Sequence, residues 1–243
     1  MKGRALFVAG LMVTALLVAS GVAWAATISC PNRSGNLCVG TDNRDTMTGR
    51  DGRTDEMRAR GGADILRARG GKDTLSGGKG RDVLKGGNAD DIYDFTNNDW
   101  GNDNITDTAD SDTDPITGNF AQFGFPNQLT TRITINLTSS ANSPEVSNGT
   151  FTGTVNWSNN AIDGVYVDSI TDDTINGNAS ANQLTAKGGP DSDDTVSGGA
   201  GNDLLNISDF DGGDTVTCGD GFDKVFFDAG DTLIDPTACE IKN

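Results

Sequence analysis

The stretch GGKGRDVLK, residues 77 to 85, decides the fold of this chain. Three of its nine residues are glycine, Asp82 is its only carboxylate, and Val83 and Leu84 are its only apolar side chains. Almost the same order of residues returns as GGAGNDLLN at residues 198 to 206. A segment with so much backbone freedom and so few apolar side chains cannot bury a core by itself, so it is informative as one unit of a repeat.

Aspartates recur through the chain in the phase that this stretch sets. After a first gap of ten residues, every gap in the first series is nine, and the residue two places after each aspartate is hydrophobic. A second series late in the chain has the same hydrophobic residue two places on, with gaps of nine, twelve, nine, eleven and nine residues. Phase kept over six repeats argues against a flexible tail rich in glycine and aspartate. The first series is Asp45, Asp55, Asp64, Asp73, Asp82 and Asp91, and the second is Asp173, Asn182, Asp194, Asp203, Asp214 and Asp223.

These residues resemble the hemolysin-type calcium-binding repeat (RTX), the nonapeptide G-G-x-G-x-D-x-U-x in which U is apolar. Residues 77–85 and 198–206 match every fixed position. The resemblance implies an all-β fold: a right-handed parallel β-roll, or β-solenoid, of calcium-binding nonapeptide repeats with an irregular central β segment. Each nonapeptide would form a turn and a short strand, two would complete one coil, and the glycines would give the turns positive φ.

Calcium is the cofactor that this arrangement implies. Coils stacked about 4.8 Å apart place aspartates two repeats apart in one column. A column of carboxylates repels itself unless a hard cation with oxygen ligands lies between the coils. The expected columns pair Asp64 with Asp82, Asp73 with Asp91, Asp194 with Asp214, and Asp203 with Asp223, and the glycines expected at the metal sites are Gly78, Gly80, Gly199 and Gly201.

Several repeats depart from the motif. Arg60 and Arg69 stand at its second position, where the family has glycine, and a bulky cation there should weaken the adjacent site. The turns before Asp45 and Asp55 lack most of the glycines, so those coils are candidates for holding no ion. Asn182 offers a neutral ligand or none.

The beginning of the chain has the pattern of an export signal. Residues 1–25 combine Lys2 and Arg4, an apolar run, and a small-residue cleavage motif that ends at Ala25. A retained membrane anchor is the alternative, because the apolar run is nearly long enough to span a bilayer. We expect cleavage, and hence a secreted, extracellular protein that has no contact with the membrane once the signal is removed.

Four cysteines remain after cleavage, an even number that suggests two disulfides in an exported protein. Three pairings exist, and we favour Cys30–Cys38 and Cys218–Cys239 because each pair is local and lies at one end of the chain. The repeats and cysteines divide the chain into five parts. They are a signal peptide (1–25), a disulfide-bearing N-terminal cap (26–39), a first RTX block (40–103), irregular connecting β coils (104–170), and a second RTX block with a disulfide-stapled C-terminal cap (171–243).

The central part carries no nonapeptides. RITINL (132–137) and TFTGTVNW (150–157) alternate apolar and polar residues, which predicts half-buried strands. We favour a continuing solenoid here, and a small separate β-sandwich is the alternative.

Charge narrows the range of partners. The formal net charge is −17, and it becomes −19 without Lys2 and Arg4. Such an acidic chain is a poor nucleic-acid binder, and its natural partners are cations. Residues 40–85 nevertheless carry eleven Lys/Arg against eight Asp/Glu, whereas residues 86–243 carry four against twenty-seven. The basic side chains of the first block could bind an anionic polysaccharide or a cell surface, and a merely solvated surface is the alternative.

We therefore predict a secreted calcium-binding protein whose β-roll folds as it binds several Ca²⁺ ions. A calcium-stiffened adhesin or matrix protein that binds anionic cell-wall polysaccharide is the main alternative, and a calcium-dependent polysaccharide lyase is the weaker one. We expect no enzyme. The chain has no histidine, which excludes Ser-His-Asp and Cys-His catalysis, and it carries no catalytic motif of the enzymes that RTX repeats accompany.

Overall fold

The computed structural model describes residues 25–31, 37–95, 101–107, 119–124, 132–137, 145–147, 152–157, 162–235 and 238–242. The predicted signal peptide lies outside these residues, apart from Ala25. No helix within the described ranges has the length and apolar character needed to cross a bilayer.

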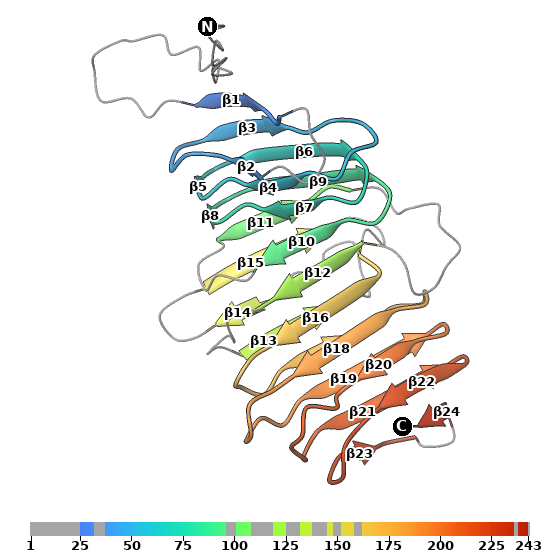
Figure 1. Cartoon of the computed structure of the whole chain (residues 1–243). Coiled ribbons are helices and arrows are strands. Elements are labelled where there is room, and N and C mark those ends of the chain that lie inside the picture. Colours follow the sequence, from blue (N-terminus) through green and yellow to red (C-terminus); the bar gives the residue numbers. More distant parts are fainter. Residues whose placement is uncertain are drawn as a thin grey trace, which may run out of the picture.

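Apart from β5, β8 and the consecutive strands β13 to β15, successive strands of the chain alternate between two sheets that stack coil upon coil along one axis (Figure 1). Neighbours in each sheet run parallel, except for the antiparallel contacts of β14 with β13 and β15. The predicted all-β parallel β-roll is thereby confirmed. A further two-stranded sheet joins two turns, β5 (Gly61–Gly62) and β8 (Lys79–Gly80).

The strands are short, as nonapeptide repeats require. The twelve-stranded sheet contains, in spatial order, β1 (Ala26–Ser29), β3 (Asp45–Thr48), β6 (Ile65–Gly70), β9 (Val83–Asn88), β11 (Asn102–Ile105), β15 (Thr152–Trp157), β14 (Glu145–Ser147), β13 (Arg132–Asn136), β17 (Thr174–Asn176), β19 (Thr195–Ala200), β21 (Thr215–Asp220) and β23 (Thr232–Leu233). The ten-stranded sheet contains β2 (Leu37–Val39), β4 (Glu56–Arg58), β7 (Thr74–Ser76), β10 (Ile92–Phe95), β12 (Phe120–Phe123), β16 (Gly164–Asp168), β18 (Gln183–Lys187), β20 (Leu204–Asn206), β22 (Asp223–Phe226) and β24 (Cys239–Lys242).

The core is a thin layer between the two sheets. Strands pair in register, so that Leu66 lies beside Leu84 in one sheet and Leu184 lies beside Leu205 in the other. Because side chains alternate along a strand, one side chain of each three-residue strand faces inward. The hydrophobic residue two places after each aspartate of the two series is fully buried, as predicted: Met47, Met57, Leu66, Leu75, Leu84, Tyr93, Ile175, Leu184, Val196, Leu205, Val216 and Val225.

The central part of the chain extends both sheets. β12 pairs with β10 on one side and with β16 on the other. In the other sheet, β15, β14 and β13 form an antiparallel unit between β11 and β17. The two strands predicted within this part from their alternating pattern correspond to β13 and β15.

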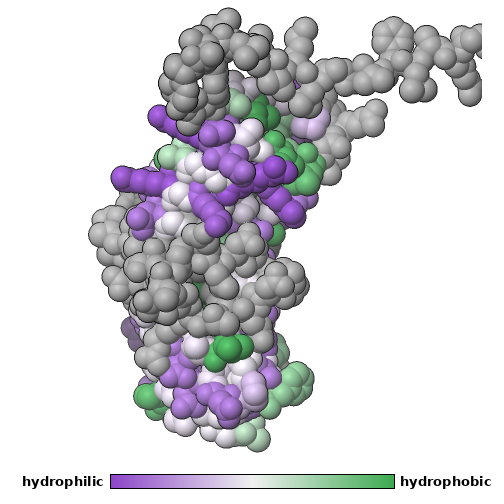
Figure 2. All heavy atoms as spheres, turned by 90° about the vertical axis from the view of Figure 1, so that its left-hand side faces the viewer, coloured by the Kyte–Doolittle hydropathy of each residue, from purple (hydrophilic) through white to green (hydrophobic). Residues whose placement is uncertain are grey.

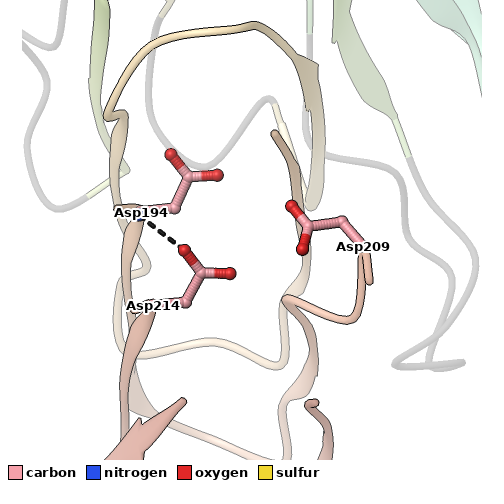
Figure 3. Close-up of side chains that lie close together, drawn as sticks. All are labelled: Asp194, Asp209 and Asp214. Carbon is pink, nitrogen blue, oxygen red and sulfur yellow. Dashed lines mark hydrogen bonds between the residues drawn. The ribbon is translucent and has the colours of Figure 1, made fainter. Parts of the chain in front are cut away.

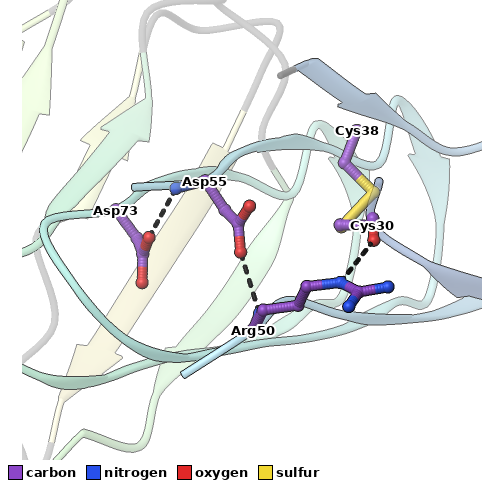
Figure 4. Close-up of a disulfide and its surroundings, with 5 residues drawn as sticks. All are labelled: Cys30, Cys38, Arg50, Asp55 and Asp73. Carbon is purple, nitrogen blue, oxygen red and sulfur yellow. Dashed lines mark hydrogen bonds between the residues drawn. A yellow bond between two sulfur atoms is a disulfide. The ribbon is translucent and has the colours of Figure 1, made fainter. Parts of the chain in front are cut away.

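Both favoured disulfides are present, Cys30–Cys38 and Cys218–Cys239. The first lies at the N-terminal end of the roll, where the Arg50 side chain donates a hydrogen bond from Nε to the Cys30 carbonyl at 3.3 Å (Figure 4). The second links Cys218 of β21 to Cys239 of β24 at the C-terminal end of the roll. Each disulfide fixes an end coil, which has a neighbouring coil on one side only.

Four glycines of the turns adopt backbone conformations that favour glycine. Gly78, Gly80, Gly199 and Gly201 have φ of 83°, 129°, 102° and 128°, values that favour glycine. A Cβ at Gly80 would lie 1.5 Å from the Gly62 carbonyl oxygen of the neighbouring coil. Backbone strain and coil-to-coil contact therefore both require glycine at this position.

Gly80→Ala should therefore destabilise the protein far more than Gly52→Ala. Gly52 also has positive φ, of 66°, but a Cβ there would meet nothing within 4 Å. We expect Gly52→Ala to cost about 1–2 kcal/mol from backbone strain alone, and Gly80→Ala to cost more because two coils must separate. Thermal unfolding in calcium measures both, and equal costs would contradict the close packing of coils at Gly80.

Candidate metal centre

In both repeat blocks, the backbone of one coil is hydrogen-bonded to a carboxylate of the next coil. The Asp64 N–H donates to Asp82 Oδ1 at 2.7 Å, and the Asp82 N–H donates to Asp103 Oδ1 at 2.8 Å. The Asp203 N–H donates to Asp223 Oδ1 at 2.7 Å in the second block. In this series, an aspartate such as Asp82 therefore accepts a hydrogen bond with its side chain and donates one with its backbone N–H. We call this series of stacked residues the ladder.

All four predicted columns are present in this ladder. The remaining pairs show the same hydrogen bond, from the Asp73 N–H to Asp91 Oδ1 at 2.8 Å and from the Asp194 N–H to Asp214 Oδ1 at 2.7 Å. Their carbonyl oxygens extend the sheets, since Asp73 and Asp194 each accept a hydrogen bond from the first strand residue of the next coil. The aspartate is thus the point at which a turn becomes a strand.

The second carboxylate oxygen of these aspartates has no hydrogen-bond donor. Oδ2 is buried and without a hydrogen bond in Asp64, Asp73, Asp82, Asp103, Asp194, Asp203, Asp214 and Asp223. A buried carboxylate oxygen without a partner is costly, because nothing replaces the water that it loses. The aspartate side chains themselves are between 0% and 2% exposed. A row of such oxygens is a set of acceptors to which a cation could bind.

The unpartnered oxygens face the glycine-rich turns. A Cβ at Gly77 would lie 2.2 Å from Asp82 Oδ2, and one at Gly198 would lie 2.4 Å from Asp203 Oδ2. Carbonyl oxygens line the same turns: a Cβ at Gly78 would lie 2.1 Å from the Arg60 carbonyl oxygen of the neighbouring coil. Carboxylate and carbonyl oxygens are the donor set that Ca²⁺ prefers, so these residues fit a calcium ion.

The departures from the motif have distinct structural effects. Both oxygens of Asp45 are partnered, since Oδ1 accepts from the Ala26 N–H at 3.1 Å and Oδ2 from the Thr41 N–H at 2.6 Å. In Asn182, Oδ1 accepts a hydrogen bond from the Asn178 N–H at 2.9 Å. These two turns are closed by hydrogen bonds of the protein itself.

Asp55 is intermediate between the two kinds of turn. Its Oδ2 accepts a hydrogen bond from the Arg50 N–H at 2.9 Å, and its N–H donates to Asp73 Oδ1 at 2.6 Å (Figure 4). Its Oδ1 is buried without a hydrogen bond. The first coils therefore offer fewer free acceptors than the coils that follow.

Arg60 and Arg69 adopt the backbone conformation of the glycines that they replace. Their φ values are 80° and 83°, close to the 83° of Gly78. An arginine in this region is strained by about 1–2 kcal/mol. Coil stacking therefore imposes the turn geometry even where the residue disfavours it, while both side chains remain exposed.

Burial raises the pKa of the ladder aspartates. Burial is the largest cause for Asp82 and Asp203, and it raises the pKa of each to about 7, with the neighbouring carboxylates Asp64 and Asp223 adding to the effect. The pKa of Asp103, also through burial first and the Asp82 charge second, is raised to about 9. At neutral pH these carboxylates are partly protonated, and a bound cation would displace those protons.

Three functional candidates were missed in the sequence. Asp103 continues the first column, but it lies twelve residues after Asp91 and so falls outside the nine-residue phase. Its signal is the GND triplet at 101–103 with Ile105 two places on. Asp107 accepts hydrogen bonds from the Gly87 N–H and the Tyr93 hydroxyl, and Asp209 accepts one from the Gly188 N–H. Neither Asp107 nor Asp209 lies at a repeat position, so the repeat pattern does not predict them.

Comparison with known families identifies the repeats. The family model described as "RTX calcium-binding nonapeptide repeat (4 copies)" matches residues 39–75, 50–84, 68–96, 169–193 and 191–206. A comparison with curated proteins finds no match to the chain. The matched segments contain all of the predicted metal-site residues except Asp214 and Asp223, and Asp103, which the sequence did not predict, also lies outside them.

The metal-free protein should become less stable as the pH rises from about 4 to about 7. The ladder aspartates bind protons more tightly in the folded chain, with pKa values near 7, than in the unfolded chain, with 3.8. Their contribution to the free energy of unfolding is therefore complete below pH 4 and is lost as the pH rises through the pKa of the folded state. Thermal unfolding of the calcium-free protein at several pH values across this range measures the slope of stability against pH.

Asp82→Asn should flatten this slope, because the amide keeps an acceptor for the Asp64 N–H without the buried charge. Asp51→Asn is the matched control, since Asp51 is exposed and its loss changes the net charge equally. If the stability of the metal-free protein stays level or rises between pH 4 and 7, the raised pKa values assigned to these buried carboxylates are refuted.

Proposed function

The chain belongs to the proteins built from RTX calcium-binding repeats, and on that premise we propose that it is a secreted protein whose β-roll folds as it binds several Ca²⁺ ions. The observation that carries this proposal is the row of buried Oδ2 oxygens without hydrogen bonds. The aspartates predicted to bind the metal are spread over both blocks, 40–103 and 171–243, which we propose as its two calcium-binding parts. Bound Ca²⁺ would supply the positive charge that the stacked carboxylates lack.

The turns would bind the metal through two kinds of oxygen. Asp64, Asp82, Asp203 and Asp223 would contribute carboxylate oxygens, and the turn backbones around Gly78 and Gly199 would contribute carbonyl oxygens. Folding and metal binding are then coupled, because the buried carboxylates come together only in the folded roll. Extracellular calcium is high enough to fill such sites, and two disulfides suit an oxidising compartment. The function that we propose is non-catalytic.

Calcium should induce β-structure cooperatively. We expect the far-UV circular dichroism of the purified protein to gain strand character at about 10⁻⁴–10⁻³ M calcium and to lose it when chelator is added. The physical reason is that stacking the coils without the ion leaves buried carboxylates unpartnered. Magnesium at equal concentration is the control, since it demands a stricter octahedral geometry. A spectrum indifferent to calcium would refute the coupling of folding to the metal.

A display function is the second candidate, and the basic side chains of the first block favour it. Arg67 and Lys85 are exposed neighbours on adjacent strands β6 and β9. Figure 2 shows strongly hydrophilic side chains gathered on the N-terminal coils. We propose that this surface binds an anionic polysaccharide or a cell surface once calcium has stiffened the roll.

Removing this basic pair should weaken binding to an anionic polysaccharide. We expect Arg67→Ser with Lys85→Ser to reduce retention on immobilised dextran sulfate in calcium several-fold, because two neighbouring cations are lost from one face. Lys224→Ser is the control, since Lys224 is exposed in the acidic second block. Equal retention of all three proteins would refute a binding role for the pair.

A further inference from the structure

The last coils carry carboxylates outside the repeat. The loop from β20 to β21 has seven residues before Asp214, whereas the turn in GGKGRD has five before Asp82. This longer loop, ISDFDGGD from Ile207, begins where the family match ends at residue 206. The nonapeptide rule therefore does not explain why it contains Asp209.

Asp209 lies against two aspartates of the ladder. One carboxylate oxygen each from Asp194, Asp209 and Asp214 lie within 4.8 Å of one another. Figure 3 shows Asp194 and Asp214 projecting from one edge of the roll toward Asp209, which faces them from the opposite side of the turn. The three side chains thus enclose one space between the loops of two successive coils.

Two of these side chains are fully buried, with an oxygen left unsatisfied. Asp194 is 1% exposed and Asp214 is 0% exposed. Oδ1 of Asp214 accepts the Asp194 N–H at 2.7 Å, while Oδ2 of each has no hydrogen-bond donor. Both oxygens of the neighbouring Asp211 are also buried without a donor. The acceptors in this space therefore outnumber the donors that the protein supplies.

A backbone contact holds Asp209 in place. Its Oδ2 accepts a hydrogen bond from the Gly188 N–H of the preceding coil at 2.7 Å. This contact fixes the carboxylate beside the ladder and leaves Oδ1 with one long contact, from the Asp211 N–H at 3.4 Å. Three carboxylates held so close repel one another strongly unless a cation lies among them.

We propose that Asp209 adds a third carboxylate, which the repeat does not provide, to the Ca²⁺ site of the column pair Asp194 and Asp214. This inference rests on the proposed calcium-dependent function. Affinity for calcium rises with the number of charged ligands, so a site with three carboxylates should fill before the repeat sites with two. The C-terminal coils would then be the first to become ordered as calcium rises.

Phe210 offers a local test. Its side chain is 96% exposed and follows Asp209 directly, so Phe210→Trp should place an indole beside the site without disturbing the core. Terbium, which replaces calcium at oxygen sites, emits when a nearby indole is excited. We expect Phe210→Trp to show terbium emission beyond that of the unmodified protein, saturating at the lowest terbium concentrations.

Asp209→Asn in the Phe210→Trp background should move this added emission to higher terbium concentrations, because Asp194 and Asp214 are then left with the two carboxylates of a repeat site. Asp191→Asn is the matched control, because Asp191 is exposed in the loop that leads to Asp194 and loses the same charge. A terbium concentration at half-saturation that is unchanged in Asp209→Asn would overturn the role of Asp209 as a third ligand.

Three further outcomes distinguish a failure of this site from a failure of the proposed function. If Asp209→Asn does not fold, Phe210→Trp alone decides: added emission that saturates below the terbium concentrations filling the other sites supports the third ligand, and emission that saturates together with them overturns it. If the unmodified protein binds calcium but Phe210→Trp adds no emission, this site fails and the proposed function stands. If the unmodified protein binds neither calcium nor terbium, the proposed function fails together with the site.

Discussion

The structure depends on one hydrogen bond that is repeated from coil to coil. The backbone N–H of a ladder aspartate donates to the carboxylate of the ladder residue in the next coil, as from Asp64 to Asp82 and from Asp203 to Asp223. This bond fixes the register of both sheets, because the aspartate lies at or directly before the start of the strand, as Asp64 does before β6. It also stacks one carboxylate above another at most coils, so the contact that orders the backbone accumulates negative charge inside the protein.

The geometry of the turns leaves the stacked carboxylates without donors, so a cation is needed to stabilise this arrangement. Glycines at positive φ let neighbouring coils approach until a carbonyl oxygen would collide with any Cβ, as at Gly80. The same approach leaves Asp82 Oδ2 buried and without a donor. Close packing and unsatisfied oxygens thus have a common origin, and a hard cation with oxygen ligands resolves both. Arg60 shows that the turn geometry comes from stacking, since it accepts a strained φ of 80°.

The dependence on metal is uneven along the roll. At the N-terminal end, Asp45 is satisfied by two backbone N–H groups, and the Cys30–Cys38 disulfide fixes the end coil. Toward the C-terminal end, Asp194 and Asp214 keep unsatisfied oxygens, and Asp209 adds a third carboxylate. The chain thus has one end closed by its own hydrogen bonds and another where carboxylates gather, which gives calcium-dependent ordering a direction.

The sequence by itself determined the period, the inward-facing residues such as Leu84 and Leu205, the stacked aspartates and both disulfides. All but the disulfides follow from a nine-residue phase in which glycine, aspartate and one apolar residue have fixed places. The two disulfides are favoured among three possible pairings because each pair is local. Only the tertiary structure decided which carboxylate oxygens lack donors, that Asp103 continues a column, and that Asp209 faces Asp194 and Asp214. Such contacts join residues about twenty positions apart through loops of irregular length, whose paths are set by packing against the neighbouring coil and not by a repeat.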